Sequence, residues 1–211
     1  MNALQCALFK SGFRRYELSP KLLELKSIRV IASFVLERVC VESTKKSPSL
    51  EVIADLRQFM CDVVALSYGK NFESKLFYKN CSVKVWLVMS GVSKAKGDHE
   101  KLALLTELHG VGVKTATYIL SVIYPSRWGY VADPSIYYSA HIGFVQWEKT
   151  YFQNISADDA IEINRALLKI SKHLGIEVAD VSFVMFLLFF YGYKSGFRNG
   201  TGRAYGVSYE Q

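Results

Sequence analysis

The sequence has few cysteines, and their spacing fits no metal-binding or redox motif. A chain of 211 residues buries enough apolar surface to fold without disulfide bonds. The four histidines also lack the H-E-x-x-H spacing of a zinc enzyme. We therefore expect buried free thiols in a reducing compartment, with neither a zinc ion nor an iron–sulfur cluster. The four cysteines are Cys6, Cys40, Cys61 and Cys81.

Long hydrophobic runs are also lacking. The longest uncharged run, Val181 to Tyr193, is too short to cross a bilayer and is typical of a core helix, expected from about Val178 to Tyr191. Near the N-terminus, Lys10, Arg14 and Arg15 interrupt the only stretch that resembles a signal peptide. These absences predict a soluble intracellular protein of the cytoplasm, nucleoid or nucleus, with no membrane partner.

The chain has an excess of positive charge. Lys and Arg number 26 against 19 Asp and Glu, which gives a formal net charge of +7. Half of the residues are apolar and 14% are aromatic, as in a folded chain of one domain. The charge favours an anionic partner such as nucleic acid, although charge alone does not identify that partner.

The hydrophobic pattern is helical along the chain and shows no α/β alternation, so we expect an all-α protein. Ser19 and Pro20 begin the first helix, which ends near the polar run at 42–49. Ser49 is expected to cap the second helix, and Gly69 to end it.

Later segments give further helix signals. Residues 72–91 fit either a strand or a helix, and we favour a helix because no partner strand is evident. Asp98 is expected to cap the next helix. Ser156 and Asp159 resemble a capping box, and Gly175 follows as the expected end of that helix.

The stretch LTELHGVGVKTATY, residues 105–118, combines two glycines with a lysine and a threonine, as a phosphate loop does. A phosphate loop needs glycine directly before the lysine, and here Val113 separates Gly112 from Lys114. The preceding segment has helical periodicity and no β-branched run. The motif therefore predicts two helices joined by a tight turn, and not a nucleotide-binding loop.

The turn between these two helices suits one phosphate of a nucleic-acid backbone. Glycines leave backbone N–H groups uncovered, and the positive end of the helix dipole attracts an anion. Such contacts position a nucleic acid without reading its sequence. The alternative is a plain turn between packed helices. The residues expected at a phosphate are Leu108, His109, Gly110, Val111, Gly112, Lys114 and Thr115.

The pattern Leu-x-Gly-Val-Gly-x-Lys-Thr-Ala, residues 108–116, resembles the hairpin of the helix-hairpin-helix DNA glycosylase superfamily. In members that also cleave the DNA backbone, a lysine at the position of Lys114 is the nucleophile. An aspartate follows in that family at the spacing of Asp133. The resemblance is specific over residues 105–140, about a sixth of the chain.

The resemblance implies one two-lobed helical domain over residues 1–211. One lobe would contain residues 1–49 and 133–211, and the other would contain 50–132 with the helix-hairpin-helix at about 99–124. DNA and one flipped base would lie between the lobes. The implied protein is a monomer that needs no cofactor, and its hairpin backbone could hold a monovalent cation.

The chemistry implied by the resemblance is removal of a damaged base followed by strand cleavage. Lys114 would displace the base at the sugar C1′ and form a Schiff base, and elimination would then break the strand. Asp133 would orient or deprotonate the amine, or stabilise positive charge on the sugar. The damaged base expected from the resemblance is an oxidised purine. The structural alternatives are a solvated charge for Lys114 and a helix cap for Asp133, which precedes Pro134.

The sequence departs from the family pattern at three places. His109 replaces the proline that usually precedes the first glycine, and Pro134-Ser135 replaces the usual small or β-branched residue and histidine. The polar segment that wedges into DNA in relatives has no clear counterpart, and residues 42–46 are the candidate. Additional contacts with DNA are expected from Lys45, Lys46, Lys194, Arg198 and Arg203.

Three functions stay open at this point. The first is a DNA glycosylase and abasic-site lyase, whose partner is duplex DNA with a damaged base or an abasic site. The second is a non-catalytic helix-hairpin-helix DNA-binding protein, in which Asp133 only caps a helix. The third is a helical module that binds an acidic protein. Salt-dependent affinity for DNA separates the third from the others, and the chemistry of Lys114 separates the first two.

Overall fold

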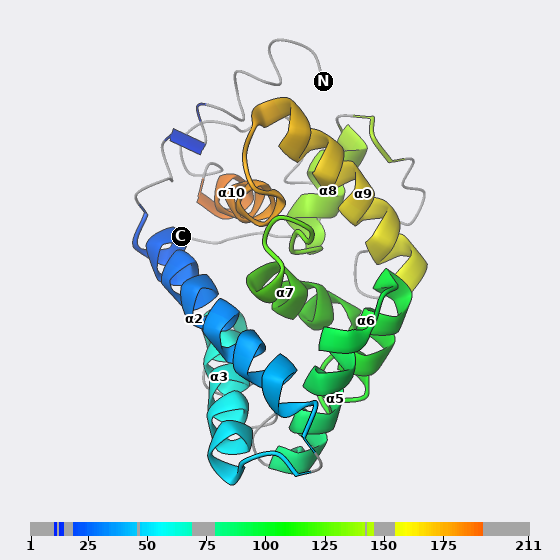
Figure 1. The fold of residues 1–211 in the computed structure, drawn as a ribbon. Coiled ribbons are helices and arrows are strands. Elements are labelled where there is room, and N and C mark those ends of the chain that lie inside the picture. The colour runs from blue at the N-terminus through cyan, green and yellow to red at the C-terminus, as the bar shows by residue number, and fades with distance from the viewer. Residues whose placement is uncertain are drawn as a thin grey trace.

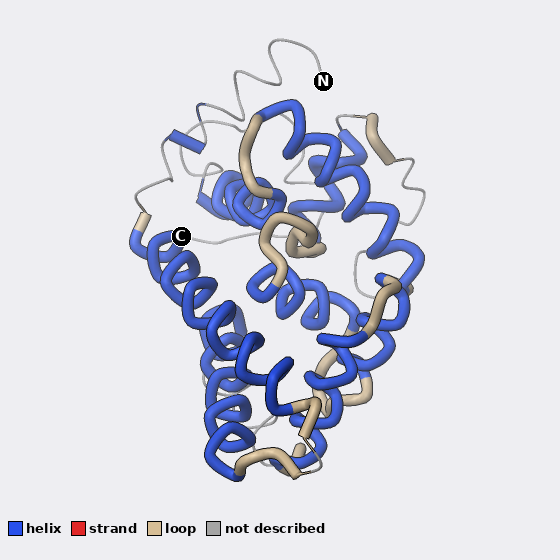
Figure 2. The backbone as a smooth tube through the Cα atoms, viewed as in Figure 1, coloured by secondary structure: helices blue, strands red, loops and turns tan. Residues whose placement is uncertain are grey.

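The computed structural model describes residues 11, 13–14, 19–45, 47–68, 79–141, 143–145 and 155–191. In these residues the chain forms eight α-helices and no strand, which confirms the predicted all-α class (Figures 1 and 2). None of the described helices has the length and apolar character needed to cross a bilayer. The helices are α2 (Pro20–Glu42), α3 (Leu50–Tyr68), α5 (Ser82–Lys94), α6 (Asp98–Thr106), α7 (Val113–Ile123), α8 (Asp133–His141), α9 (Ala157–Leu174) and α10 (Val178–Tyr191).

Most helix ends lie where the capping residues predict them. The hydroxyl of Ser19 accepts a hydrogen bond of 3.3 Å from the amide of Leu22 at the start of α2. Ser156 and Asp159 form the predicted capping box of α9. That helix ends at Gly175, whose φ of 68° lies in the left-handed region that favours glycine. The bounds of α10 agree with the prediction, whereas Gly69 lies outside the described residues.

Two helix starts differ from the prediction by one residue. Gly97 is the N-cap of α6, so Asp98 lies in the first turn, where it pairs with Arg127 at 2.9 Å instead of capping. The carbonyl of Ala132 accepts the first hydrogen bond of α8, so Asp133 is the first residue of that helix and not its cap. In both places the aspartate side chain meets a cation from another segment. Tertiary pairing therefore overrides the local capping preference.

The other local expectations have mixed outcomes. Residues 82–91 belong to α5, so the strand alternative is wrong for that part of the segment. Cys61 is buried as predicted, whereas Cys40 and Cys81 are exposed, so the prediction of buried thiols is wrong for these two.

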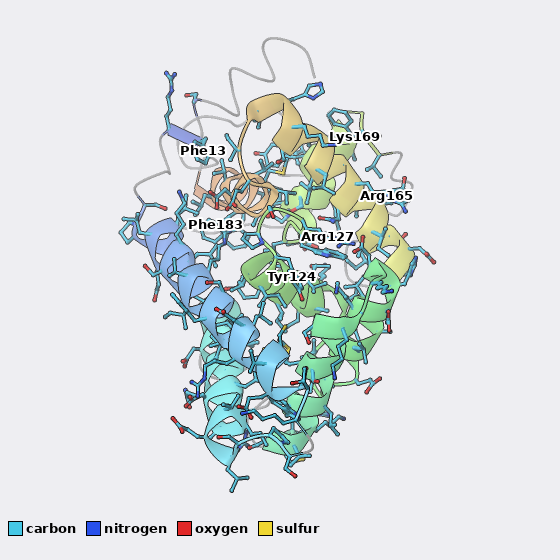
Figure 3. The ribbon with its side chains drawn as sticks, viewed as in Figure 1. Phe13, Tyr124, Arg127, Arg165, Lys169 and Phe183 are labelled. Atoms are coloured by element: carbon cyan, nitrogen blue, oxygen red, sulfur yellow. The ribbon has the colours of Figure 1, made fainter. Side chains whose placement is uncertain are left out.

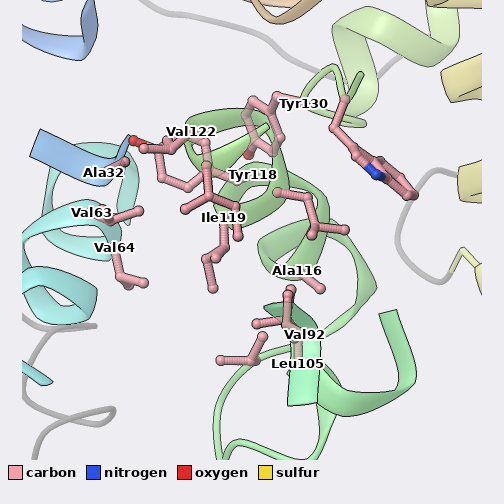
Figure 4. Close-up of a cluster of buried hydrophobic side chains, with 14 of the residues drawn as sticks. Ala32, Val63, Val64, Val92, Leu105, Ala116, Tyr118, Ile119, Val122 and Tyr130 are labelled. Carbon is pink, nitrogen blue, oxygen red and sulfur yellow. The ribbon is translucent and has the colours of Figure 1, made fainter. Parts of the chain in front are cut away.

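Helix α7 lies at the centre of the bundle. All its residues from Thr115 to Ile123 are buried, as expected for a helix that other helices surround. In Figure 4, side chains of α2, α3, α5 and α6 converge on those of α7. The labelled residues of this cluster are Ala32, Val63, Val64, Val92, Leu105, Ala116, Tyr118, Ile119, Val122 and Tyr130. The hairpin that precedes α7 is therefore attached to a helix that the core surrounds.

The packing divides the helices into two groups. Helices α2, α3, α5, α6 and α7 pack on one another, while α8, α9 and α10 form a second cluster that contacts the first mainly through α6 and α7. An ion pair between Arg29 of α2 and Asp180 of α10 also joins the two clusters. In this arrangement α2 lies mainly with α3, α5 and α7. The predicted lobe composed of residues 1–49 and 133–211 stays a prediction, because most residues before Ser19 and after Tyr191 lie outside the described part.

A buried lysine joins the first helix of the hairpin to α5. The Lys101 ammonium donates to the carbonyls of Val92 and Ala95 at the end of α5 and lies 5.1 Å from the centre of the Tyr124 ring. Burial lowers the pKa of Lys101 and raises the pKa of Tyr124. Because Lys101 bonds two terminal carbonyls, it acts as a side-chain cap for α5 and fixes α6 beside it.

Candidate functional site

The predicted turn between two helices is present. Residues 107–112 connect α6 to α7, and the amide of Val111 donates a 3.0 Å hydrogen bond to the carbonyl of Leu108 across the turn. Gly110 has a φ of 84°, in the left-handed region that a residue with Cβ rarely adopts. The first glycine of the motif is thus required by the backbone of the turn.

Asn80 holds the turn from outside the motif. Its side-chain amide donates to the carbonyl of His109 at 3.0 Å and accepts from the amide of His109 at 2.8 Å. Asn80 is only 1% exposed, so its side chain lies in the core while His109 remains at the surface. Sequence reasoning missed this residue, because an isolated asparagine before a helix carries no signal of a partner 29 residues away.

Gly112, the second glycine, has a different role from Gly110. It is the N-cap of α7 with φ −86° and ψ 176°, a conformation open to any residue. A Cβ atom built on Gly112 would meet nothing within 4 Å. Ala116 donates the first helical hydrogen bond, to the carbonyl of Gly112, so the amides of residues 113–115 lie outside the ladder. The packing of the fold does not require glycine at position 112. The absence of a side chain there leaves the amides of residues 113–115 accessible to an external anion.

The turn borders an open depression of about 540 Å³ on the surface. Lys84 of α5 contributes a positive charge to its wall, and Glu107 contributes a negative one. Three predicted phosphate-binding residues, Leu108, Val111 and Thr115, have buried side chains, so only their backbone groups can face a ligand. The lining residues are Lys84, Thr106, Glu107, Leu108, His109, Gly110, Val111 and Gly112.

The structure brings Lys114 and Asp133 into direct contact. Nζ of Lys114, in the first turn of α7, lies 2.5 Å from Oδ1 of Asp133, the first residue of α8. The Lys114 side chain is 25% exposed and that of Asp133 is 50% exposed, so both groups reach solvent. The carboxylate lies within hydrogen-bonding distance of the proton that the lysine must lose before it can act as a nucleophile.

Thr117 ties the two partners of this pair together. Its hydroxyl donates to the carbonyl of Lys114 at 2.8 Å and accepts from the amide of Val131 at 3.1 Å. The side chain of Thr117 is fully buried. One hydroxyl therefore links the first turn of α7 to the segment that leads into Asp133.

The segment between α7 and α8 is fixed by two further helices. Asn164 of α9 accepts from the amide of Gly129 at 2.9 Å and donates to the carbonyl of Arg127 at 3.1 Å. Ser182 of α10 accepts from the amide of Tyr130 at 2.8 Å. Arg127 is labelled in Figure 3, close to the start of this segment. Because the segment is hydrogen-bonded from three helices, Asp133 is held in a defined position by the core.

An aromatic residue follows each member of the Lys114–Asp133 pair by about one helical turn. Tyr118, one turn after Lys114, makes an edge-to-face contact with Tyr130, with ring centroids 5.2 Å apart. Both rings are buried and belong to the core. Tyr137 lies one turn after Asp133 on α8 and is partly exposed. Tyr118 and Tyr130 are thus part of the core packing, and an aromatic pocket for a flipped base stays a prediction.

Of the additional predicted DNA contacts, only Lys45 belongs to the described residues, and it lies in the loop between α2 and α3. Lys45 donates to the carboxylate of Glu42, which also accepts from the amide of Ser49 at 3.1 Å. These bonds, first the one from Lys45 and then the one from Ser49, lower the pKa of Glu42. Lys45 therefore stabilises the loop between α2 and α3. Four predicted contacts lie outside the described residues, namely Lys46, Lys194, Arg198 and Arg203.

Comparisons with known proteins identify no relative of the chain. The functional interpretation therefore depends on the chemistry and geometry of the hairpin and of the Lys114–Asp133 pair. No family model, curated protein or solved structure matches the chain.

Proposed function

We propose that the protein is a DNA glycosylase with abasic-site lyase activity, of the helix-hairpin-helix type that residues 105–140 resemble. The observation that carries this proposal is the contact between Lys114 and Asp133 directly behind the glycine turn. A nucleophile, its proton acceptor and a backbone anion site then lie within one short stretch of structure. The two-lobed arrangement of that family and an oxidised purine as substrate belong to the same proposal.

In the proposed reaction the hairpin anchors one DNA phosphate and Lys114 attacks the neighbouring sugar. The proton of the Lys114 ammonium passes to Asp133, and the free amine forms a bond to C1′ while the bond from C1′ to the base breaks. The departing base takes the proton that Nζ loses on bonding to C1′. Opening of the sugar, in which O4′ takes up the proton held by Asp133, gives a Schiff base to Nζ. Asp133 then accepts the proton lost from C2′ as the bond from C3′ to the 3′ phosphate breaks. Flipping the base from the helix costs a few kcal/mol, which the protein must offset by binding.

The experiment that tests this proposal is reductive trapping on duplex DNA with one abasic site. Borohydride reduces a Schiff base to a stable amine, so the unmodified protein is expected to form a covalent complex with the DNA. Lys114→Ala is expected to form none while still binding the duplex. The measurement is the fraction of DNA shifted to the protein–DNA adduct on a denaturing gel. An adduct of equal yield from Lys114→Ala would refute Lys114 as the nucleophile.

Lys84→Ala is the matched control for this experiment. Lys84 lines the depression at the hairpin but lies away from the Lys114–Asp133 contact. Losing one phosphate contact is expected to weaken DNA binding and to reduce its logarithmic salt slope by about one. At saturating protein the yield of trapped complex should equal that of the unmodified protein. Binding by all three proteins without any trapped complex would favour a non-catalytic DNA-binding role instead.

That second candidate, a non-catalytic helix-hairpin-helix DNA-binding protein, is favoured by one observation. Asp133 begins α8 and its contact with Lys114 joins α7 to α8, which is by itself a structural role. The pair is partly exposed and is worth no more than about 1 kcal/mol of stability. A structural role alone would thus give Lys114→Ala a nearly unchanged melting temperature and no distinctive chemistry.

A substitution at Gly112 tests the phosphate-binding role of the hairpin. Serine is a better N-cap than most residues, so Gly112→Ser is expected to leave the melting temperature equal or slightly higher. Its hydroxyl would bond the first free amides of α7 and cover the site of the phosphate. We expect DNA affinity to fall several-fold, measured by fluorescence anisotropy. Unchanged affinity would identify the hairpin as a plain interhelical turn.

A further inference from the structure

Helix α2 carries an apolar stripe that faces solvent. Leu23, Val30, Phe34 and Val41 are 46, 59, 63 and 56% exposed. At 3.6 residues per turn their side chains fall within about 40° of one another around the helix axis. They therefore form one continuous line, which we call the α2 stripe. From Leu23 to Val41 it extends over about 27 Å.

The opposite face of α2 is also apolar. Leu22, Leu25, Ala32 and Val39 are at most 4% exposed and pack into the core. A surface helix normally places polar residues opposite its buried face, and a helix with apolar residues on both faces normally has partners on both. Figure 1 shows α2 at the outer edge of the helices. The α2 stripe is thus a face suited to a protein partner.

The spacing of the stripe is symmetric along the helix. Its four residues follow one another by seven, four and seven positions, so the pattern reads the same in both directions from Ala32. In an antiparallel pair of α2 helices centred at Ala32, Leu23 meets Val41 and Val30 meets Phe34. A two-fold interface requires such self-complementarity, and steps of seven and four residues are those of a helix–helix seam.

The charges beside the stripe favour the antiparallel orientation. Glu24 and Arg38 flank the stripe on the same side, so Glu24 of one copy meets Arg38 of the second copy, and symmetry repeats this contact. Arg38 also pairs with Asp55 of its own chain at 2.7 Å, and both side chains are about half exposed, so the guanidinium can face both carboxylates. Glu37 lies within the seam, opposite Ser27 of the second copy. A parallel pair would instead place the two Glu37 carboxylates face to face, which is unfavourable.

A groove beside the C-terminal half of α2 offers room for the second copy. It has a volume of about 470 Å³ and lies between α2 and the start of α3. Phe34 and Val41 of the stripe form part of its wall. In the antiparallel pair this groove faces Leu23 of the second copy, which is 46% exposed in the single chain. The lining residues are Phe34, Glu37, Arg38, Val41, Glu42, Ser49, Glu51 and Val52.

We propose that the protein forms a two-fold symmetric homodimer through antiparallel pairing of α2. This proposal replaces the monomer expected from sequence. It goes beyond the proposed enzymatic function, and it uses no residue of the hairpin or of the Lys114–Asp133 pair. A seam of one helix buries less surface than a standard interface, so the dimer dissociates on dilution.

The test is sedimentation velocity of the full chain over a range of concentrations. The unmodified protein is expected to change from the monomer mass to twice that mass as concentration rises. Phe34→Asp places a charge in the seam and should remain monomeric throughout that range. Leu87→Asp is the matched control, because Leu87 on α5 is 64% exposed and lies outside the stripe. It should dimerise like the unmodified protein.

Charge reversal tests the orientation. Glu24→Arg would face Arg38 of the second copy and should weaken dimerisation by several-fold or more. Combining it with Arg38→Glu, in a chain that also carries Asp55→Asn so that the new carboxylate meets no aspartate of its own chain, should restore the dimer, since the contact is then reversed. Circular dichroism of each variant shows whether it is folded. A protein that stays monomeric at every concentration refutes the proposal, and so does a dimer that Phe34→Asp leaves intact. Failure of the combined variant to restore the dimer refutes the antiparallel orientation.

Discussion

Replacing Asp133 by asparagine is expected to slow strand cleavage at an abasic site by about 100- to 10,000-fold, the usual contribution of a general base. Asparagine has the same shape as aspartate but cannot take the proton that Lys114 must lose. The substitution also removes the negative charge of Asp133, whose Oδ1 lies 2.5 Å from Nζ of Lys114 and orients it. The measurement is the single-turnover rate of cleavage at saturating protein.

Affinity and stability should respond to Asp133→Asn in a different way from the rate. Removal of a negative charge beside the DNA backbone is expected to keep or slightly raise the affinity for DNA. The carboxylate is 50% exposed, so its ion pair contributes no more than about 1 kcal/mol to folding. A large loss of rate with normal binding and melting temperature would thus arise from the chemistry and not from unfolding.

Asp98→Asn is the matched control. Asp98 is likewise an aspartate at the first position of a helix, and it pairs with one cation, Arg127, at 2.9 Å. It lies at the opposite end of α6 from the hairpin. Its cleavage rate should equal that of the unmodified protein. If Asp133→Asn also cleaves at that rate, Asp133 is a structural partner of Lys114 and the mechanism needs another base.

Local signals in the sequence were enough for the hairpin and for most of the helix ends. The capping box at Ser156 and the glycine at Gly175 act within one turn of the chain, so their effect does not depend on the rest of the fold. The same holds for the turn at Gly110, whose backbone conformation only glycine adopts readily. The contact between Lys114 and Asp133 joins residues 19 positions apart, and no local signal predicts it.

The residues that position this pair could not be predicted from sequence. Asn80, Thr117 and Asn164 are ordinary polar residues in the sequence, and each becomes important only because a distant backbone group approaches it. Asp98 shows the same limit in another form. Aspartate is a favourable N-cap residue, yet in the folded protein the Asp98 carboxylate accepts a hydrogen bond from Arg127 and does not cap the helix. Hydrogen bonds across the fold carry no periodicity that a sequence pattern could reveal.

Exposure of the α2 stripe was equally hidden in the sequence. Leu22 and Leu23 are neighbours of the same type, yet one is fully buried and the other is 46% exposed. An apolar pattern all round a helix indicates only that both of its faces are suited to packing against another surface. The packing of α3, α5 and α7 on one face determines which face remains available.

Replacing Asp180 by alanine is expected to destabilise the protein by about 3–5 kcal/mol, more than any other single ion-pair substitution among the described residues. Asp180 of α10 accepts a hydrogen bond from the Arg29 guanidinium of α2, and both side chains are only 6% exposed. Nε and Nη2 of Arg29 are buried without another partner. Removal of Asp180 therefore leaves a buried cation whose remaining neighbour, Glu177, is 3.9 Å away. Equilibrium unfolding in denaturant measures the loss.

Two comparisons separate burial of a charge from loss of a contact. Asp55→Ala removes a similar partner from Arg38, at 2.7 Å, but both side chains are about half exposed and the expected cost is at most about 1 kcal/mol. Replacing both Arg29 by methionine and Asp180 by leucine removes the buried charges altogether and should recover most of the stability. If Asp180→Ala lowers the free energy of unfolding no more than Asp55→Ala does, water reaches Arg29. The ion pair between α2 and α10 is then not shielded from solvent.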